Sequence, residues 1–237
     1  MSNAGAKYKV LAIIPARKGS KRVAGKNTRL LAGIPLVEYS LRAASQSQLI
    51  TRLIVSSDDK EVEAISRRFE RSIFLERPAA LSSDTSPAID YVRHALDNFN
   101  SEPWDYVVII QPTTPFVSSE DIDATIRLAI SNDAPSAVSV VRIQQLHHPW
   151  KLKVMRGNSL EPFMTQEKNI RQAQELPELY ARNGGVYVSS RETISKGLII
   201  GDPCLGYVMP FERSVDINEP IDFEFAEFLA GKYHQNS

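Results

Sequence analysis

Short apolar runs alternate with segments of helical period along most of the chain. The run from Val10 to Ile14 is almost continuously apolar, which predicts a strand buried on both faces at the centre of a sheet. Comparable runs predict further strands at 53–57, 72–76, 106–110, 137–141, 185–189 and 206–209. Strands that alternate with helices in this way are typical of an α/β domain with a mostly parallel sheet.

Capping residues predict where two of the helices begin. Asp58 with Glu61 three residues later has the spacing of a capping box. Ser86 before Pro87 matches an N-cap followed by a proline at the first helical position. An amphipathic pattern at 221–232 predicts a further helix.

The alternation breaks between residues 147 and 178. Three prolines and a glycine interrupt a polar stretch that has no clean period, which predicts an inserted hairpin or arm. We place this arm at 142–182, within a single domain that spans 5–237. Residues 1–4 are excluded as a remnant of an expression vector.

The composition is that of an ordinary globular protein. Of 237 residues, 43% are hydrophobic and 24% charged, which excludes collagen-like, disordered and coiled-coil classes. The net charge is zero, which argues against binding of nucleic acid or of an anionic membrane by the whole surface. We expect neither a signal peptide nor a membrane-spanning segment, because no apolar run approaches the required length. With Cys204 as the single cysteine, a reducing cytoplasm is the expected location.

The loop at 15–27 concentrates positive charge. Its five cations are Arg17, Lys18, Lys21, Arg22 and Lys26, and it has no acidic residue. Close like charges repel by on the order of 1 to 4 kcal/mol per pair, and a polyanion would relieve that repulsion. Glycines in the loop let backbone N–H groups approach an oxygen-rich ligand at the carboxyl end of a central strand. The alternative interpretation is a solvated basic surface loop.

Two common phosphate-binding motifs are absent. From Gly19 the Walker A spacing fails by one residue, and Asn27 stands where that motif needs a hydroxyl. The G-x-G-x-x-G pattern of dinucleotide-binding loops is also missing. The loop therefore indicates binding of a nucleoside triphosphate by another kind of motif.

Several segments together resemble one known family. They are IPARKGSKRVAGKN at 14–27, RPAALSSDT at 77–85, QPTTP at 111–115, HHPWK at 147–151, LP at 176–177, NGGVY at 183–187 and VDIN at 215–218. In this order they resemble the acylneuraminate cytidylyltransferases, which couple nonulosonic acids such as sialic acid to CMP. The resemblance implies a three-layer α/β sandwich with a Rossmann-like sheet of the nucleotide-diphospho-sugar transferase type. It also implies a homodimer in which the small inserted arm exchanges between subunits.

In such enzymes the anomeric hydroxyl of the sugar attacks the α-phosphorus of CTP, and pyrophosphate leaves. The resemblance implies phosphate contacts from the first loop, with Asn27 helping to hold the nucleotide or serving only as a turn residue. The implied phosphate-binding residues are Arg17, Ser20, Lys21 and Lys26. Arg17, Lys26 and Asp216 are the expected catalytic residues.

By the same resemblance Arg77 recognises the base, the alternative being a surface turn before Pro78. Ala88 departs from the family, which more often has a hydroxyl there, so base selectivity is less secured than phosphate binding.

The expected sugar-side residues follow from the resemblance as well. They are Gln111, Lys151, Arg171 and Arg182. Gln111 directly follows the strongest predicted strand and precedes stiffening prolines, although it could instead satisfy loop backbone groups. Ala173 stands where the family has an arginine, so the cation that meets the sugar carboxylate stays open between the other three.

Asp216 and Asn218 are two residues apart on an extended stretch, which points both side chains to one side. The family has Asp-x-Asp here, a pair of oxygen ligands for Mg²⁺. The amide of Asn218 can still bind a hard cation, but with one negative charge fewer. Its alternative role is an N-cap for the helix that begins after Glu219-Pro220.

Three functional hypotheses remain at this stage. The first is a cytidylyltransferase for a nine-carbon sialic, legionaminic or pseudaminic type acid. The second is a related enzyme that uses 3-deoxy-octulosonate or GTP. The third is a non-catalytic nucleotide-sugar binding protein, to which the departures at Ala88, Ala173 and Asn218 would point.

Overall fold

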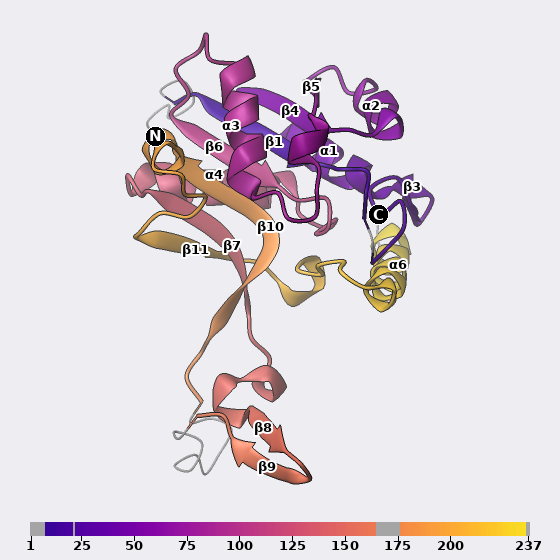
Figure 1. The fold of residues 1–237 in the computed structure, drawn as a ribbon, viewed down its shortest axis with the longest axis vertical. Helices are drawn as coiled ribbons and strands as arrows, with labels where there is room; N and C mark the ends of the chain where they lie inside the picture. The colour runs from indigo at the N-terminus through magenta and orange to yellow at the C-terminus, as the bar shows by residue number, and fades with distance from the viewer. Residues whose placement is uncertain (1–7, 21, 165–175, 236–237) are drawn as a thin grey trace.

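The computed structural model describes residues 8–20, 22–164 and 176–235, and its framework is one seven-stranded sheet (Figure 1). The strand order is β11-β7-β10-β6-β1-β4-β5. The strands are β1 Val10–Pro15, β4 Arg52–Ser57, β5 Ser72–Glu76, β6 Tyr106–Ile110, β7 Ser136–Arg142, β10 Tyr180–Ser190 and β11 Cys204–Val208. Two short strands, β2 Leu30–Leu31 and β3 Ile34–Pro35, pair beside the sheet.

The sheet is mostly parallel, as the sequence predicts. β1 pairs in parallel with β4 and β6, β4 with β5, and β7 with β11. β10 runs antiparallel to both of its neighbours, β6 and β7. The carboxyl ends of β1, β4, β5 and β6 therefore meet at one edge of the sheet.

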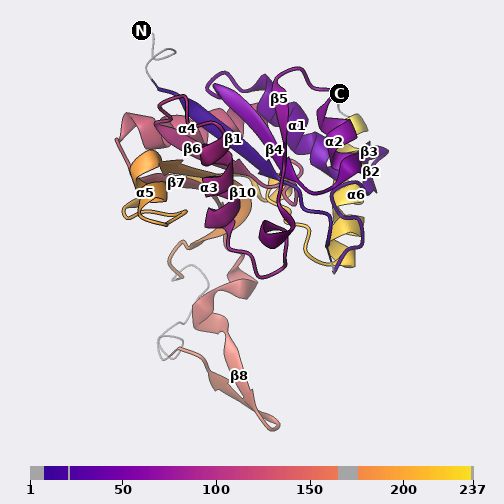
Figure 2. The same ribbon diagram turned by 45° about the horizontal axis from the view of Figure 1, so that its top comes forward.

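Helices cover both faces of the sheet and make three layers (Figure 2). The helices are α1 Leu36–Gln46, α2 Lys60–Ser66, α3 Ala88–Asn98, α4 Ser119–Ser131, α5 Arg191–Ser195 and α6 Pro220–Gln235. Alternate residues of β1 serve the two faces: Ala12 and Ile14 pack in the core under α1, α2 and α4, while Leu11 and Ile13 pack under α3 and α5. Burial of β1 on both faces confirms its predicted central place.

Both predicted helix starts are displaced by one residue. α2 is capped by Asp59, which accepts from Glu61 N at 2.9 Å. Asp58 instead accepts from Lys18 N at 2.8 Å and holds the first loop. α3 begins after Pro87, and the Ser86 hydroxyl contacts Ser83 rather than the helix. The two side chains expected to cap the helices, Asp58 and Ser86, therefore form hydrogen bonds with neighbouring loops instead.

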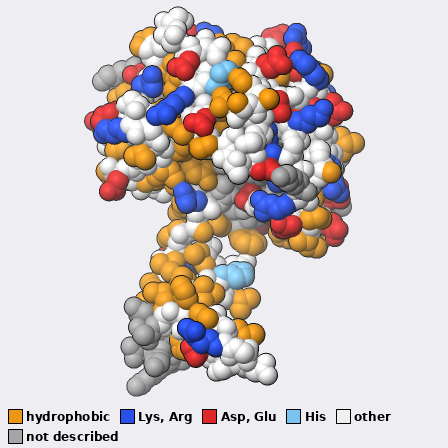
Figure 3. Space-filling view, viewed as in Figure 1, with side chains coloured by type: hydrophobic (Ala, Val, Ile, Leu, Met, Phe, Trp, Pro, Cys, Tyr) orange, Lys and Arg blue, Asp and Glu red, His pale blue; other side chains and the backbone are white. Residues whose placement is uncertain are grey.

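Between β7 and β10 the chain leaves the sheet and forms a projecting arm (Figure 1). Two single turns, η2 Gln145–His147 and η3 Pro149–Lys151, lead into the hairpin of β8 Lys153–Arg156 and β9 Ser159–Pro162. Every residue of β8 and β9 is exposed. Figure 3 shows hydrophobic side chains gathered over this arm.

None of the helices in the described part of the chain is long and apolar enough to cross a membrane.

Candidate active site

A cleft of about 320 Å³ opens at the carboxyl ends of the parallel strands. Its walls come from the loop after β1, the segment after β5, the loop after β6 and the residues that precede α6. Eight of the predicted site residues line it: Arg17, Ser20, Lys26, Asn27, Arg77, Gln111, Asp216 and Asn218. Residues up to 200 positions apart in the sequence thus meet in one place because parallel strands end at the same edge.

Among the described cations of the first loop Lys26 is the most buried, with 8% of its surface exposed. Its Nζ donates to Ile217 O at 2.7 Å, so it already bridges the first loop and the segment before α6. Burial lowers the pKa of Lys26, and the nearby Arg22 and Arg17 lower it further, while Asp216 opposes this change. A cation held in this way gains from any anion that enters the cleft.

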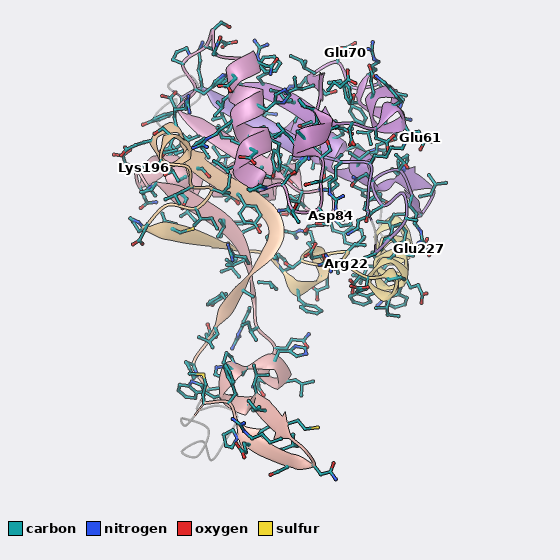
Figure 4. All side chains as sticks on the ribbon, viewed as in Figure 1. Arg22, Glu61, Glu70, Asp84, Lys196 and Glu227 are labelled. Carbon is teal, nitrogen blue, oxygen red and sulfur yellow. The ribbon has the colours of Figure 1, made fainter. Side chains whose placement is uncertain are left out.

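Arg17 lies across the cleft from Asp84, and the two form an ion pair of 2.5 Å. A second nitrogen of the same guanidinium donates to the carbonyl of Gly19 in its own loop. Asp84 and Arg22, both cleft residues, lie at the same end of the sheet (Figure 4). Arg17 is thus positioned for an anion but held by a carboxylate that a phosphate would have to displace.

Asn27 serves the loop itself. Its Nδ2 donates to Arg17 O at 2.9 Å, and its carbonyl accepts from Val37 N at 2.9 Å. These contacts connect the loop to the start of α1. Ser20 lines the cleft from the same loop.

Arg77 is not on a surface turn, so that alternative is wrong: only 4% of the residue is exposed. Its Nε and one terminal nitrogen donate to Ser56 Oγ and O at 3.0 and 2.8 Å. The guanidinium stacks 4.6 Å from the ring centroid of Tyr91. Burial lowers the pKa of Arg77 and raises that of Tyr91. The two side chains together form one wall of the cleft.

Gln111 follows β6, and its backbone N–H donates to Gly185 O at 3.1 Å on the neighbouring β10. Its Oε1 is 3.5 Å from the hydroxyl of Thr113, a long hydrogen bond. The loop backbone is therefore satisfied largely by other groups, and the side chain faces the cleft.

Asp216 has the donor character that a hard cation needs. Its Oδ1 is buried and accepts no hydrogen bond from the described residues. Its Oδ2 accepts from Asn218 Nδ2 at 2.7 Å. Gly184 has φ of +79°, and a Cβ there would lie 3.4 Å from the Asp216 carboxylate. The left-handed backbone conformation is what favours glycine at this position, next to the Asp216 carboxylate.

Asn218 does not cap α6, so this alternative is wrong. The carboxylate of Asp222 accepts from the backbone N–H groups of Asn218 and Glu219 at 2.8 and 2.7 Å, and it is the capping group. The Oδ1 of Asn218 accepts a long bond of 3.4 Å from Arg22. A carboxylate and a neighbouring amide oxygen fit a hard cation such as Mg²⁺. Within the described residues no group of three or more His, Cys, Asp or Glu side chains could hold a metal, so further ligands would have to come from substrate or water.

Two further predicted sugar-side residues, Lys151 and Arg182, do not line this cleft. Lys151 lies exposed in the arm, and Arg182 lies exposed on β10. Arg182 is close enough to Tyr187 to lower its pKa, although burial raises that pKa overall. Lys21 and Arg171, and the departure at Ala173, lie outside the described residues.

The sequence analysis missed four cleft residues or partners: Tyr91, Asp84, Thr113 and Asp222. The first three line the cleft. Asp84 and Thr113 lie inside segments that carry the family resemblance, so their place in those segments could have indicated them as cleft residues. Tyr91 is a core position on the helical pattern of α3, and nothing in that pattern distinguishes it from packing.

The sequence of this chain is similar to the sequences of known proteins. The profile of a family described as cytidylyltransferase matches residues 11–204. The chain is 34% identical over 228 residues to CMP-N,N'-diacetyllegionaminic acid synthase of Legionella pneumophila, covering 93% of this chain and 96% of that protein. It is 29% identical to N-acylneuraminate cytidylyltransferase of Escherichia coli, covering 92% of this chain and 51% of that protein.

Among solved structures, the fold is similar to that of CMP:2-keto-3-deoxy-manno-octonic acid synthetase in complex with CTP. The TM-score is 0.68 at 17% identity, covering 95% of this chain and 99% of that one. At this identity the likeness concerns the fold alone.

Proposed function

The chain belongs to the cytidylyltransferase family and is a nucleotidyltransferase, and we propose that it couples CTP to a nonulosonic acid of the sialic, legionaminic or pseudaminic type, releasing pyrophosphate. The observation that carries this proposal is the meeting of Arg17, Lys26 and Asp216 in one cleft at the carboxyl ends of the parallel strands. Phosphoryl-transfer sites need little covalent chemistry from the protein and depend on positioned charge.

In the proposed reaction the anomeric oxygen of the sugar acid forms a bond to the α-phosphorus of CTP. The bond from that phosphorus to the β-phosphate oxygen breaks, and the electron pair leaves with pyrophosphate. The proton of the anomeric hydroxyl passes to water. Lys26 and Arg17 would neutralise the charge that develops on the phosphate oxygens. For this Arg17 would exchange its pair with Asp84 for a phosphate oxygen, while Lys26 would keep its bond to Ile217 O and offer its other N–H groups to the phosphates.

We assign Arg77 to the base end of the cleft, and Ser20 and Asn27 to the nucleotide between base and phosphates. Burial and stacking on Tyr91 leave Arg77 one fixed orientation. A fixed guanidinium can hydrogen-bond a base edge at little entropic cost.

Asp216 would hold Mg²⁺, with Asn218 as a second, neutral ligand and the triphosphate and water as the others. The unpaired Oδ1 of Asp216 supports this assignment. When bound, the ion would offset phosphate charge and orient the leaving group. Independently of the metal, Asp216 lowers the cost of keeping Lys26 charged beside Arg22 and Arg17.

Gln111 would contact the sugar from this chain, and Lys151, Arg182 and Arg171 would supply cations for its carboxylate. Lys151 lies in the arm, so we propose that it acts in the cleft of a second copy of the chain, within a homodimer. The arm exposes large apolar side chains that such an exchange would cover. They include Leu146, Met155, Leu160 and Phe163, each more than half exposed.

The experiment is a measurement of pyrophosphate release with CTP, Mg²⁺ and a panel of nonulosonic acids. N,N'-diacetyllegionaminic acid is the first to test, because the relative from Legionella is named for it. Reactions with 3-deoxy-octulosonate, with GTP in place of CTP, and without sugar are the controls. We expect turnover with one of the nine-carbon acids, and with CTP but not with GTP.

Two outcomes would contradict the proposal. Preferred turnover of 3-deoxy-octulosonate or of GTP would make the chain a different member of the same enzyme class. Binding of CTP with no release of pyrophosphate across the panel would favour a binding protein that has lost the chemistry.

A further inference from the structure

Asp121 is a fully buried carboxylate away from the cleft, in the first turn of α4. It accepts from the backbone N–H and the hydroxyl of Ser118 at 2.9 and 3.0 Å, which is a capping contact. It also accepts from Arg213 Nε at 3.1 Å, from a terminal nitrogen of Arg213 at 2.7 Å, and from Tyr207 OH at 3.1 Å. A cap alone needs only the Ser118 contacts, so the bonds from Arg213 and Tyr207 call for another reason.

The Asp121–Arg213 pair joins two of the segments that form the walls of the cleft. Asp121 follows the loop at 111–118, which contributes Gln111 to the cleft. Arg213 ends the turn η6 Phe211–Arg213, three residues before Asp216. The pair therefore connects, across 92 positions of sequence, the loop after β6 to the segment before α6.

Nearer the cleft, the backbone of Ile217 connects the segment before α6 both to the loop at 111–118 and to the first loop. Ile217 N donates to Thr113 O at 2.8 Å, and Ile217 O accepts from Lys26 Nζ at 2.7 Å. Any shift of residues 214–218 relative to the loop at 111–118 would move Asp216 and the carbonyl of Ile217 away from Lys26. The Asp121–Arg213 pair can fix the position of residues 214–218 relative to the cleft.

We propose that Asp121 and Arg213 are positioning residues, which hold residues 214–218 so that Asp216 and Ile217 O stand at the correct distance from Lys26. Neither residue lines the part of the cleft that holds Lys26, and neither touches a reacting atom. The inference rests on the proposed function, because it assigns Asp216 and Lys26 to the reaction.

The two-bond geometry of the pair is the argument for positioning over stability. Two parallel bonds from a planar guanidinium fix direction as well as distance. A buried ion pair contributes little net stability compared with apolar side chains of the same size. If the pair served stability alone, a neutral replacement of similar shape would serve as well.

The test compares Arg213→Met, Asp121→Asn/Arg213→Met and Arg213→Lys with the wild type. The double variant keeps the Ser118 cap and removes both charges, so its melting temperature should recover relative to Arg213→Met. Arg52→Met is the matched control, because Arg52 pairs with Glu102 at 2.5 Å near the start of β4, far from the cleft. Arg213→Lys keeps the charge without the planar fork and covers the case in which Arg213→Met does not fold.

Two readouts are measured on each variant. The first is the Mg²⁺ concentration for half-maximal turnover, with saturating CTP and the sugar acid that the wild type uses. We expect a rise of about tenfold in Arg213→Met and in the double variant, as for partners that orient a ligand. The second is hydrogen–deuterium exchange of the ligand-free protein over 214–218, which should be faster in both variants and unchanged in Arg52→Met.

A double variant with wild-type exchange over 214–218 and a wild-type Mg²⁺ requirement would overturn the proposal, because the pair would then be structural only. The proposal would also be overturned if both effects, the raised Mg²⁺ requirement and the faster exchange over 214–218, disappeared in the double variant as its melting temperature recovered. If the wild type itself shows no turnover, the proposed function fails, and the exchange measurement alone decides the role of the pair.

Discussion

The cleft and the arm differ in how much of their structure one chain supplies. In the cleft, Lys26 is buried and bonded to Ile217, and Arg77 is buried between Ser56 and Tyr91. In the arm, β8 and β9 are exposed at every position, and Leu146 is 74% exposed. Contacts within the chain therefore hold the part of the cleft proposed to bind the nucleotide, whereas Lys151 lies in an arm whose described strands are exposed at every position.

Lys26→Ala tests the cleft and should have the largest effect. It removes a buried cation from the phosphates and a positive charge that interacts with Asp216, so turnover should fall by about 10² to 10³-fold. Pyrophosphate release at saturating CTP and sugar acid measures it. Lys18→Ala is the control, because Lys18 is exposed in the same loop and does not line the cleft. A near-normal rate in Lys26→Ala would remove Lys26 from the mechanism.

Lys151→Ala tests the arm. Loss of a cation for the sugar carboxylate should raise the KM for the sugar acid by about tenfold and leave the KM for CTP unchanged. Lys153→Ala, two residues further along the arm, is the matched control. Equal changes in both KM values would show that Lys151 has no separate sugar-side role.

Mixing the Lys26→Ala and Lys151→Ala variants sharpens the same comparison, provided that the sugar acid is kept well below its KM, where both variants are impaired. If the arm exchanges between subunits, a dimer of one Lys26→Ala and one Lys151→Ala chain has one intact site, and the mixture should regain about a quarter of the wild-type rate. Activity that stays at the level of the separate variants would place Lys151 in the cleft of its own chain, or outside the site.

The sequence predicted the cleft far better than the arm, for a physical reason. Strands buried on both faces must be apolar, so their positions are legible, and the parallel order then brings their carboxyl ends together. Gln111 directly follows β6, and Arg17 and Lys26 lie in the loop that follows β1. The arm has no buried face of its own, so no period marks its strands.

Partners within the cleft could not be predicted from the sequence. Asp84 meets Arg17, and Asp121 meets Arg213, across 67 and 92 positions that no local pattern links. Asn218 illustrates the same limit at short range, because its spacing fits a helix cap but Asp222 takes that role. Side-chain competition of this kind is settled only by the packed structure.

Asn218→Asp should have a moderate effect confined to the cleft. It restores a second carboxylate beside Asp216, so the Mg²⁺ concentration for half-maximal activity should fall by a few-fold. The measurement is a Mg²⁺ titration of pyrophosphate release at saturating CTP, with Glu219→Gln, an exposed neighbour, as the control. An unchanged requirement would exclude residue 218 as a metal ligand.

Acid stability gives the smallest expected effect and separates the cleft from the arm once more. Burial raises the pKa of Asp121, but hydrogen bonds from Arg213 and Ser118 outweigh it and hold that pKa below its ordinary value. A lowered folded-state pKa stabilises the protein above the unfolded value of about 3.9, and this contribution is lost as the pH falls through the folded-state pKa. Arg213→Met should therefore lose unfolding free energy at neutral pH and show a shallower decline below pH 4. The matched arm variant, Arg156→Met, breaks an exposed pair with Glu161 and should change neither quantity measurably, because solvent screens such pairs. Urea unfolding between pH 3 and pH 7 measures both, and parallel profiles for the two variants would mean that the buried pair is no better coupled to folding than the exposed one.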